Sequence, residues 1–261
     1  MGWLKIWDQV GVVVCQGGAI YATRGTNLRP TGDVYAFSGT PLRWTRIGGP
    51  GSLFAADNAT LYGLSPDRQA VYEYTGTPGE WLQIGGPAAT LYAGAYGLFA
   101  TNPDSGDIYR YEGRPMHWIQ VGGPGKTFAV GGQALFGLAP DGSAVLQFTG
   151  TPMEWQAIGG PAAALYAGGQ HLYTTNPDTG DVYRYEGKDT HWVRIGGPGK
   201  MFAAGGRNLY GLSPDGSAVF RNAGVPMEWT KIGGPAGAIY ASRGCLLATN
   251  PKSHDLWLHE P

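Results

Sequence analysis

One residue recurs through this chain at a fixed interval. Tryptophan stands at seven positions that are each 37 residues apart: Trp7, Trp44, Trp81, Trp118, Trp155, Trp192 and Trp229. Six of them open the pattern W-x-x-[IV]-G-G-P, and the copy at Trp7 is degenerate. Because this spacing does not drift over the whole chain, it predicts seven copies of one structural unit.

Each unit is expected to contain four short strands. Between Trp155 and Trp192 the expected strands lie near 155–158, 164–167, 171–175 and 181–185, and turns rich in Gly, Pro, Asn and Asp separate them. Such turns every eight to ten residues are typical of a β-meander, and no window shows the apolar period of a helix. The 45 glycines and 19 prolines among 261 residues agree with many tight turns.

The two ends of the chain select a ring over a linear array. The last unit stops without its fourth strand, whereas residues 2–7 form a strand that belongs to no unit. An N-terminal strand that completes the last unit closes a ring, while a solenoid would need polar capping repeats. We therefore predict one all-β domain over residues 1–261. This domain is a seven-bladed β-propeller of four-stranded antiparallel blades, in which the blades start near the seven tryptophans and the N-terminal strand completes the C-terminal blade.

The units are of two kinds that alternate. The first kind carries G-L-[SA]-P-D and occurs in the units from Trp44, Trp118 and Trp192. The second kind carries [AT]-T-N-P and occurs in the units from Trp81, Trp155 and Trp229. The unit from Trp7 joins the second kind through Thr-Gly-Asp-Val-Tyr at 31–35, but it lacks four residues after Gly11 and gains four within 24–30. Equivalent surfaces are thus expected on every second blade, and the distorted first unit is expected to lack a normal pocket.

Charge and hydropathy exclude several classes of function. The net charge is −1 and no basic stripe is present, so neither nucleic acid nor an anionic membrane is an expected partner. No apolar run approaches the roughly 18–20 residues that span a bilayer. The start MGWLKIWDQV lacks the apolar core of a signal peptide, which favours a cytoplasmic location or leaderless secretion. Cys15 and Cys245 fall in blades adjacent across the closure, where a disulfide is allowed but not required.

The motifs resemble those of a known group of proteins. W-x-x-[IV]-G-G-P is followed by Leu-Tyr-Ala-Gly-Gly and then by Gly-Asp-Val-Tyr-Arg-Tyr. This order resembles the tectonin and tachylectin group of β-propeller lectins over essentially the whole chain, although the repeat length and the two alternating kinds depart from it. The resemblance implies a multivalent lectin that binds cell-surface glycans, including methylated or N-acetylated sugars, in shallow pockets between blades.

The repeated tryptophans allow two interpretations. A large aromatic side chain can be a wedge packed between blades, where burial stabilises the fold by a few kcal/mol. An exposed indole edge can instead stack on the apolar face of a sugar, and one ring can serve both roles. The carbohydrate-binding candidates of this type are Trp44, Trp81, Trp118, Trp155, Trp192 and Trp229.

Polar residues that recur beside the turns form a second group of candidates. One set comprises Asn102, Asn176, Asn250, Asp67, Asp141 and Asp215. These turns lack the distal Glu of a calcium loop, so they are expected to be Asx-stabilised turns whose side chains also offer hydrogen bonds to sugar hydroxyls. The other set directly precedes the tryptophans, as either the rim of a site or the solvent face of an outer strand: His117, His191, Glu80, Glu154 and Glu228.

Catalysis finds little support in this pattern. The polar groups are copied around the ring, and no unique constellation of His, Glu or Asp interrupts the repeat. We therefore expect no enzymatic activity, no metal and no cofactor. The alternative to a lectin is a non-catalytic scaffold that binds other proteins through one face of the ring.

Overall fold

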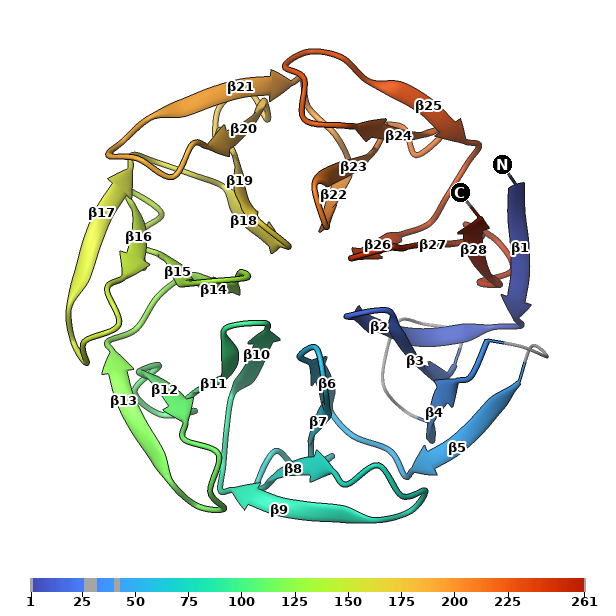
Figure 1. The fold of residues 1–261 in the computed structure, drawn as a ribbon, viewed down its shortest axis with the longest axis vertical. Helices are drawn as coiled ribbons and strands as arrows, with labels where there is room; N and C mark the ends of the chain where they lie inside the picture. The colour runs from blue at the N-terminus through green and yellow to red at the C-terminus, as the bar shows by residue number, and fades with distance from the viewer. Residues whose placement is uncertain (1, 26–31, 40–42, 261) are drawn as a thin grey trace.

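Each blade of the molecule is a sheet of four antiparallel strands, and seven blades stand in a ring (Figure 1). This computed structural model describes residues 2–25, 32–39 and 43–260. Every regular element among them is a strand, and none of them belongs to a helix long and apolar enough to cross a membrane. The predicted architecture, a seven-bladed all-β ring, is confirmed.

The strands follow one another from the centre of the ring to its perimeter. Blade 1 contains β2 (Val10–Gln16), β3 (Ala19–Arg24), β4 (Val34–Phe37) and β5 (Trp44–Gly48). Blade 2 contains β6 (Leu53–Ala56), β7 (Leu61–Leu64), β8 (Val71–Tyr74) and β9 (Trp81–Gly85). Blade 3 contains β10 (Thr90–Gly94), β11 (Gly97–Thr101), β12 (Ile108–Tyr111) and β13 (Trp118–Gly122). Blade 4 contains β14 (Thr127–Val130), β15 (Leu135–Leu138), β16 (Val145–Phe148) and β17 (Trp155–Gly159).

The remaining blades continue this order. Blade 5 contains β18 (Ala164–Gly168), β19 (His171–Thr175), β20 (Val182–Tyr185) and β21 (Trp192–Gly196). Blade 6 contains β22 (Met201–Gly205), β23 (Asn208–Leu212), β24 (Val219–Asn222) and β25 (Thr230–Gly233). Blade 7 contains β26 (Ile239–Ser242), β27 (Cys245–Thr249), β28 (Leu256–Glu260) and the N-terminal β1 (Gly2–Trp7).

The ring closes as the chain ends predict. Strand β1 pairs antiparallel with β28, so the outermost strand of blade 7 comes from the N-terminus (Figure 1). Lys5 on β1 forms an ion pair of 3.0 Å with Asp255, and the Val10 N–H donates to the carbonyl of His254. The first and last segments of the sequence thus form one sheet, in which β1 covers the outer edge of β28.

The predicted starting points of the blades are wrong. The repeated tryptophans stand at or next to the beginning of the outermost strands, such as β5 and β9, so they mark the last strand of a blade. The next blade begins after the Gly-Gly-Pro turn. The period of a repeat gives the length of the unit but not the residue at which a blade begins, because the period is the same whichever residue is taken as the first.

Trp7 is also not the first of the equivalent tryptophans. The Trp3 indole donates to the Ile232 carbonyl at 3.0 Å, as the Trp44 indole donates to the Ile6 carbonyl at 2.8 Å. Trp3 therefore opens the first W-x-x-I, and Trp7 takes the place of the glycine that follows it elsewhere. With this alignment nothing is missing after Gly11. The gain of four residues between β3 and β4 remains, and its segment 26–31 lies outside the described residues.

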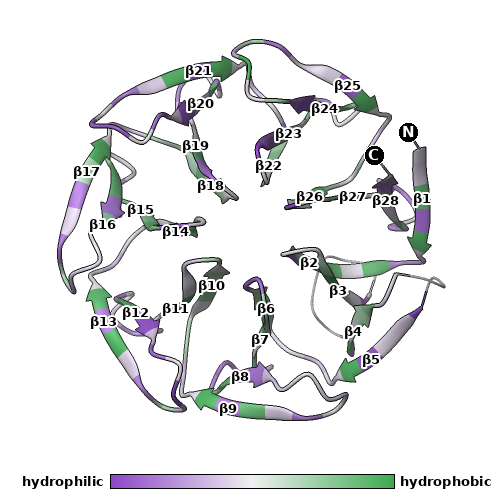
Figure 2. Cartoon of the chain, viewed as in Figure 1, coloured by the Kyte–Doolittle hydropathy of each residue, from purple (hydrophilic) through white to green (hydrophobic). Residues whose placement is uncertain are grey.

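The core lies between neighbouring blades. In the junction of blades 2 and 3, Leu64 and Ile84 from one blade pack with Leu91 and Leu98 from the next, and all four side chains are buried. Figure 2 shows hydrophobic carboxyl ends on the outer strands with hydrophilic residues in the middle. Each blade is thus held by its two neighbours, which fixes the geometry of the clefts between them.

Candidate binding site between the blades

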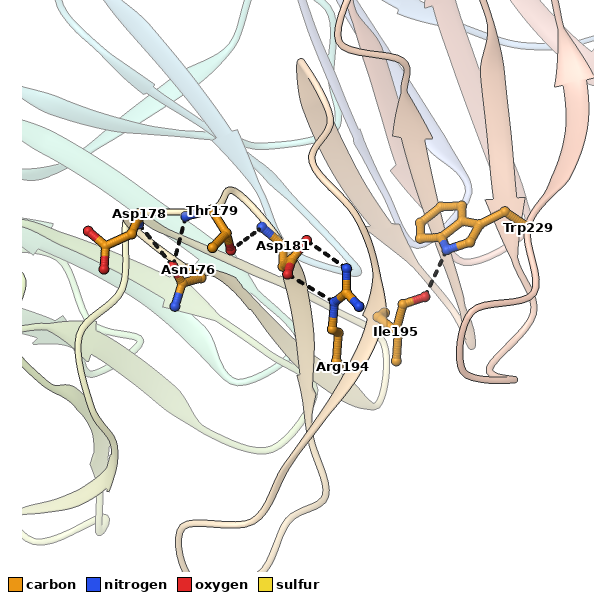
Figure 3. Close-up of polar contacts among 7 residues, drawn as sticks. All are labelled: Asn176, Asp178, Thr179, Asp181, Arg194, Ile195 and Trp229. Carbon is orange, nitrogen blue, oxygen red and sulfur yellow. Dashed lines mark hydrogen bonds and ion pairs between the residues drawn. The ribbon is translucent and has the colours of Figure 1, made fainter.

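Each outer-strand tryptophan is bonded to the blade before it. The indole N–H donates to a backbone carbonyl on the outer strand of the preceding blade. The acceptor is the Ile or Val of W-x-x-[IV], and the distance is 2.7 to 3.0 Å in all seven junctions. Figure 3 shows this bond from Trp229 to Ile195. In four junctions a backbone N–H donates to the same carbonyl: Gly79, Met116, Met153 and Met227. The wedge interpretation of the tryptophans is therefore correct.

The first glycine of Gly-Gly-Pro makes this contact possible. A Cβ at Gly48 would lie 2.6 Å from the indole nitrogen of Trp81, and a Cβ at Gly122 would lie equally close to that of Trp155. Both distances are shorter than real Cβ contacts, so at these two junctions a side chain in place of the glycine would force the indole to shift. The motif therefore encodes a joint between blades as well as a turn.

The indole also lines a cleft in blade 2. This cavity of about 270 Å³ is open to solvent and lies where the turn from β5 meets β7, β8 and β9. Its lining is Gly49, Pro50, Gly51, Phe54, Gly63, Leu64, Ser65, Pro66, Tyr72 and Trp81. None of these side chains is ionised, and most of the surface is apolar. The cleft therefore suits a neutral ligand that has an apolar face.

A second cleft occupies the same place in blade 7, five blades further along the chain. It has a volume of about 130 Å³ and is lined by Trp3, Pro235, Asn250 and Trp257 among others. Trp3 corresponds to Trp81, Pro235 to Pro50, and Trp257 to Tyr72. The two clefts are thus copies of one site that combines an indole, a proline and an aromatic ring from the third strand.

Blade 1 departs from this pattern. Its Tyr35 stands at the repeat position of Tyr72, and the guanidinium of Arg24 lies 5.6 Å from the centre of that ring. The same guanidinium lies 5.9 Å from the ring of Trp7, and both distances are within the range of a cation–π contact. Arg24 thus covers Tyr35, the counterpart in blade 1 of the ring that lines the cleft in blade 2, which supports the expectation of an abnormal first pocket.

The predicted asparagines are bound into their own turns. The Asn176 side-chain oxygen accepts the backbone N–H groups of Asp178 and Thr179 at 2.9 Å (Figure 3). Asn102 and Asn250 repeat this arrangement. The Asx-turn interpretation is correct, and one member of the set, Asn250, also lines the cleft of blade 7.

The predicted aspartates Asp67, Asp141 and Asp215 also stabilise turns. Asp215 accepts hydrogen bonds from the Ser217 backbone and from the Ser213 and Ser217 hydroxyls, which lowers its pKa to about 2. Similar bonds lower the pKa of Asp67 and Asp141. None of the three lines the cleft of blade 2 or blade 7, although Ser65 and Pro66 beside Asp67 do.

The residues before the tryptophans lie elsewhere. His117, His191, Glu80, Glu154 and Glu228 are exposed in the turns between third and fourth strands. Consecutive strands of a meander run in opposite directions. The turns before the tryptophans therefore lie at the other end of the strands from the Asn and Asp turns, on the opposite face of the ring. His117 lines a separate hollow of about 460 Å³ with Glu112, Arg114, Met116, Trp118 and Ile119. The structure therefore divides the predicted candidates into two groups that do not share a cleft.

Sequence reasoning missed several residues that line the two clefts, among them Pro50, Pro235, Tyr72 and Trp257. The prolines belong to the repeated Gly-Gly-Pro motif, which was interpreted only as a turn. Tyr72 and Trp257 occupy one repeat position that is aromatic in six of the seven blades, as Tyr35, Tyr72, Tyr109, Tyr183, Phe220 and Trp257. An aromatic residue repeated beside each motif was thus the available signal.

No protein-family model matches the sequence, and no curated protein matches it either. Solved structures match over the whole ring. A catalytically inactive virginiamycin B lyase from Staphylococcus aureus with quinupristin is 10% identical, with a TM-score of 0.68 over 100% of this chain and 99% of that one. The β-propeller domain of Cps50 (Swd1) from Myceliophteria thermophila is 10% identical, with a TM-score of 0.65 over 100% of both chains. YCF48 bound to D1 peptide is 10% identical, with a TM-score of 0.63 over 99% and 97%. What these proteins share with this chain is the fold, a seven-bladed β-propeller.

Proposed function

We propose that this protein is a non-catalytic, multivalent carbohydrate-binding protein whose sites are the clefts between blades. The observation that supports the proposal is the recurrence of one cleft in blades 2 and 7, with an indole, a proline and a third-strand aromatic ring at the same repeat positions. These blades are of different kinds, so the shared cleft does not follow the alternation expected from the sequence. The tectonin-like and tachylectin-like motifs point to the same class of ligand.

The chemistry of the clefts fits a neutral sugar. Carbohydrates present C–H groups on one face, and these pack on aromatic rings such as those of Tyr72 and Trp81. Hydroxyl groups require hydrogen bonds, which the side-chain NH2 group of Asn250 in blade 7 can donate while its oxygen holds the turn. Methylated or N-acetylated sugars add an apolar group and are the preferred candidates.

Multivalency compensates for shallow sites. A single site of millimolar affinity corresponds to about −4 kcal/mol. Two or more such sites on a rigid ring gain avidity of about 10²-fold on a glycan-coated surface, provided the glycans span the distance between clefts. Function on cell surfaces therefore does not require a deep pocket.

A glycan array that includes methylated and N-acetylated sugars tests the proposal. We expect binding to at least one neutral glycan, and a loss of about tenfold or more in avidity when the double variant Tyr72→Ala/Trp257→Ala removes one ring from each of two clefts. Met116→Ala changes the separate hollow that His117 lines, at the other end of the strands, and is the matched control. An array without signal, or equal losses in both variants, would contradict the proposal.

A protein-binding scaffold is the second candidate, and exposed methionines favour it. Met116, Met153 and Met227 are 61%, 59% and 54% exposed at equivalent turns. Each has a positive φ, near 65°, which is a strained conformation for a residue other than glycine. In this case a partner would be captured in the presence of excess free sugar, and Met116→Ala/Met153→Ala/Met227→Ala would release it while Tyr72→Ala would not.

A further inference from the structure

The two cysteines of the chain meet where the ring closes. Cys15 lies on β2 of blade 1, and Cys245 begins β27 of blade 7, opposite Ser242 of β26. Strands β2 and β26 are neighbours across the closure, with the N-terminal blade on one side and the C-terminal blade on the other (Figure 1). Both cysteines belong to the apolar cluster that fills this junction, and both are free thiols.

Each cysteine is unique among the seven copies of its position. The repeat position of Cys15 holds alanine or valine in the other blades: Ala56, Ala93, Val130, Ala167, Ala204 and Ala241. The repeat position of Cys245 holds other residues: Ala19, Thr60, Gly97, Ala134, His171 and Asn208. The two exceptions face each other across one junction, and it is the junction where the chain ends meet.

The two thiols lie in one cluster and are close enough to shift each other's pKa. A hydrogen bond from the Cys15 thiol lowers the pKa of Cys245, while the same bond and burial raise the pKa of Cys15 well above its usual value. The Ser242 side chain opposes the rise at Cys15. Cys245 is therefore the better thiolate of the pair, and the Cys15 sulfur stands beside it.

Small molecules reach the pair from the centre of the ring. Cys15 lines an axial cavity of about 420 Å³ that the inner strands of all seven blades surround. Cys245 is only 7% exposed and does not line this cavity. A small oxidant entering the axial cavity meets Cys15 first, and Cys245 is positioned to react second.

We propose that Cys15 and Cys245 form a reversible disulfide that joins the first blade to the last across the closure of the ring. The oxidant is a low-molecular-weight disulfide. Cys15, which the oxidant meets first, passes its proton to the Cys245 thiolate and attacks one sulfur of the small disulfide, which forms a mixed disulfide. The small thiolate that leaves takes this proton back from Cys245 and is released as a thiol. The Cys245 thiolate then attacks the Cys15 sulfur and releases the second small thiol, so two electrons and two protons pass from the protein to the small disulfide.

The bond would convert a non-covalent closure into a covalent one. Without it, the contacts of β1 with β28 and of blade 1 with blade 7 close the ring. A bond between Cys15 and Cys245 encloses almost the whole chain in one loop, and long loops restrict the unfolded chain most. Oxidation is therefore expected to stabilise the folded ring.

The test uses the full-length protein with glutathione disulfide or with dithiothreitol. After oxidation we expect both thiols to resist alkylation under denaturing conditions, the intact mass to fall by about 2 Da, and peptide mapping to join Cys15 to Cys245. The midpoint of thermal unfolding should rise by roughly 10 °C and return on reduction. Cys15→Ala and Cys245→Ala each introduce a residue that some other blades carry at that position, and neither variant should form the intramolecular disulfide or gain stability on oxidation.

Three outcomes would overturn the proposal. The first is that both thiols remain open to alkylation after oxidation. The second is a product that stops at a glutathione adduct or links two molecules. The third is an intramolecular disulfide that leaves the unfolding midpoint unchanged, because the bond would then not secure the closure.

Discussion

At the scale of single residues, the repeated motif encodes a joint between blades. The indole of each outer-strand tryptophan donates to a carbonyl of the preceding blade, and the glycine after that carbonyl leaves space for the ring. The sequence left the wedge role as one of two interpretations of the repeated tryptophans. It could not predict the partner carbonyl, because that bond joins residues 34 apart through the packing of two blades.

Replacement of that glycine should destabilise the protein. In Gly122→Ala the new Cβ would lie 2.6 Å from the Trp155 indole nitrogen, so we expect a loss of about 1–3 kcal/mol in the free energy of unfolding. Gly123→Ala, next to it, adds a methyl group whose closest neighbour is 3.9 Å away. Denaturant unfolding of the two variants checks this, and equal stability would contradict the joint.

The acidic turns should give a local pH dependence. The pKa of Asp215 is lowered to about 2, so the carboxylate stabilises the fold above pH 4, and this contribution is lost as pH falls from about 4 towards 2. NMR titration of Asp215 measures it directly. Ser213→Ala should raise the pKa towards the usual value near 3.9, whereas Ser65→Ala in blade 2 should leave Asp215 unchanged. An Asp215 pKa that ignores Ser213→Ala would count against the turn assignment.

At the scale of elements, alternation of the two kinds of blade follows from packing. The inner strands place tyrosine in blades of the second kind where those of the first kind have alanine. Tyr92 meets Phe128 of the next blade edge to face at 5.6 Å, and Tyr166 meets Phe202 in the same way at 5.7 Å. The tyrosine of a second-kind blade thus packs against the phenylalanine of the first-kind blade that follows it.

A double-mutant cycle measures this packing. For Tyr92→Ala and Phe128→Leu we expect a coupling of about 0.5–1.5 kcal/mol in the free energy of unfolding, since an aromatic pair contributes that much beyond its buried area. Tyr166 and Phe202 should give the same value, because the contact is repeated. Additive effects at both junctions would show that the alternation has another cause.

At the scale of the whole molecule, seven blades of two alternating kinds cannot close without one mismatch. The mismatch lies between blades 7 and 1, where Tyr240 packs in a cluster with Val13 and Cys15 in place of a phenylalanine. Trp7, which replaces a glycine, and Arg24, which covers Tyr35, both lie near this junction. Irregular residues thus gather where the ring cannot repeat itself.

Removal of the N-terminal strand should open this junction. A chain without residues 1–7 leaves β28 as a sheet edge and deprives Trp44 of its acceptor at Ile6. We expect broader thermal unfolding and self-association through the free edge. A synthetic peptide of residues 2–9 should restore the unfolding midpoint, and a scrambled peptide should not. Unchanged unfolding of the truncated chain would contradict closure by β1.

Period and chain ends were sufficient to predict the ring, its blade number and its closure. The clefts were harder to predict, because their lining combines residues from several strands and from the turn of the preceding blade. Tyr72 and Pro50 come together only through the fold. The His and Glu candidates were chosen because they precede the tryptophans, and this position in the sequence does not tell at which end of the strands they lie.

The central claim, that equivalent clefts bind sugar, is tested most directly by a crystal structure of the protein with a neutral glycan found by array. The account predicts sugar density against Tyr72 and Trp81 in blade 2 and against Trp257 and Trp3 in blade 7, in matching orientations. Density confined to the axial cavity or to the hollow at His117, with both clefts empty, would contradict it.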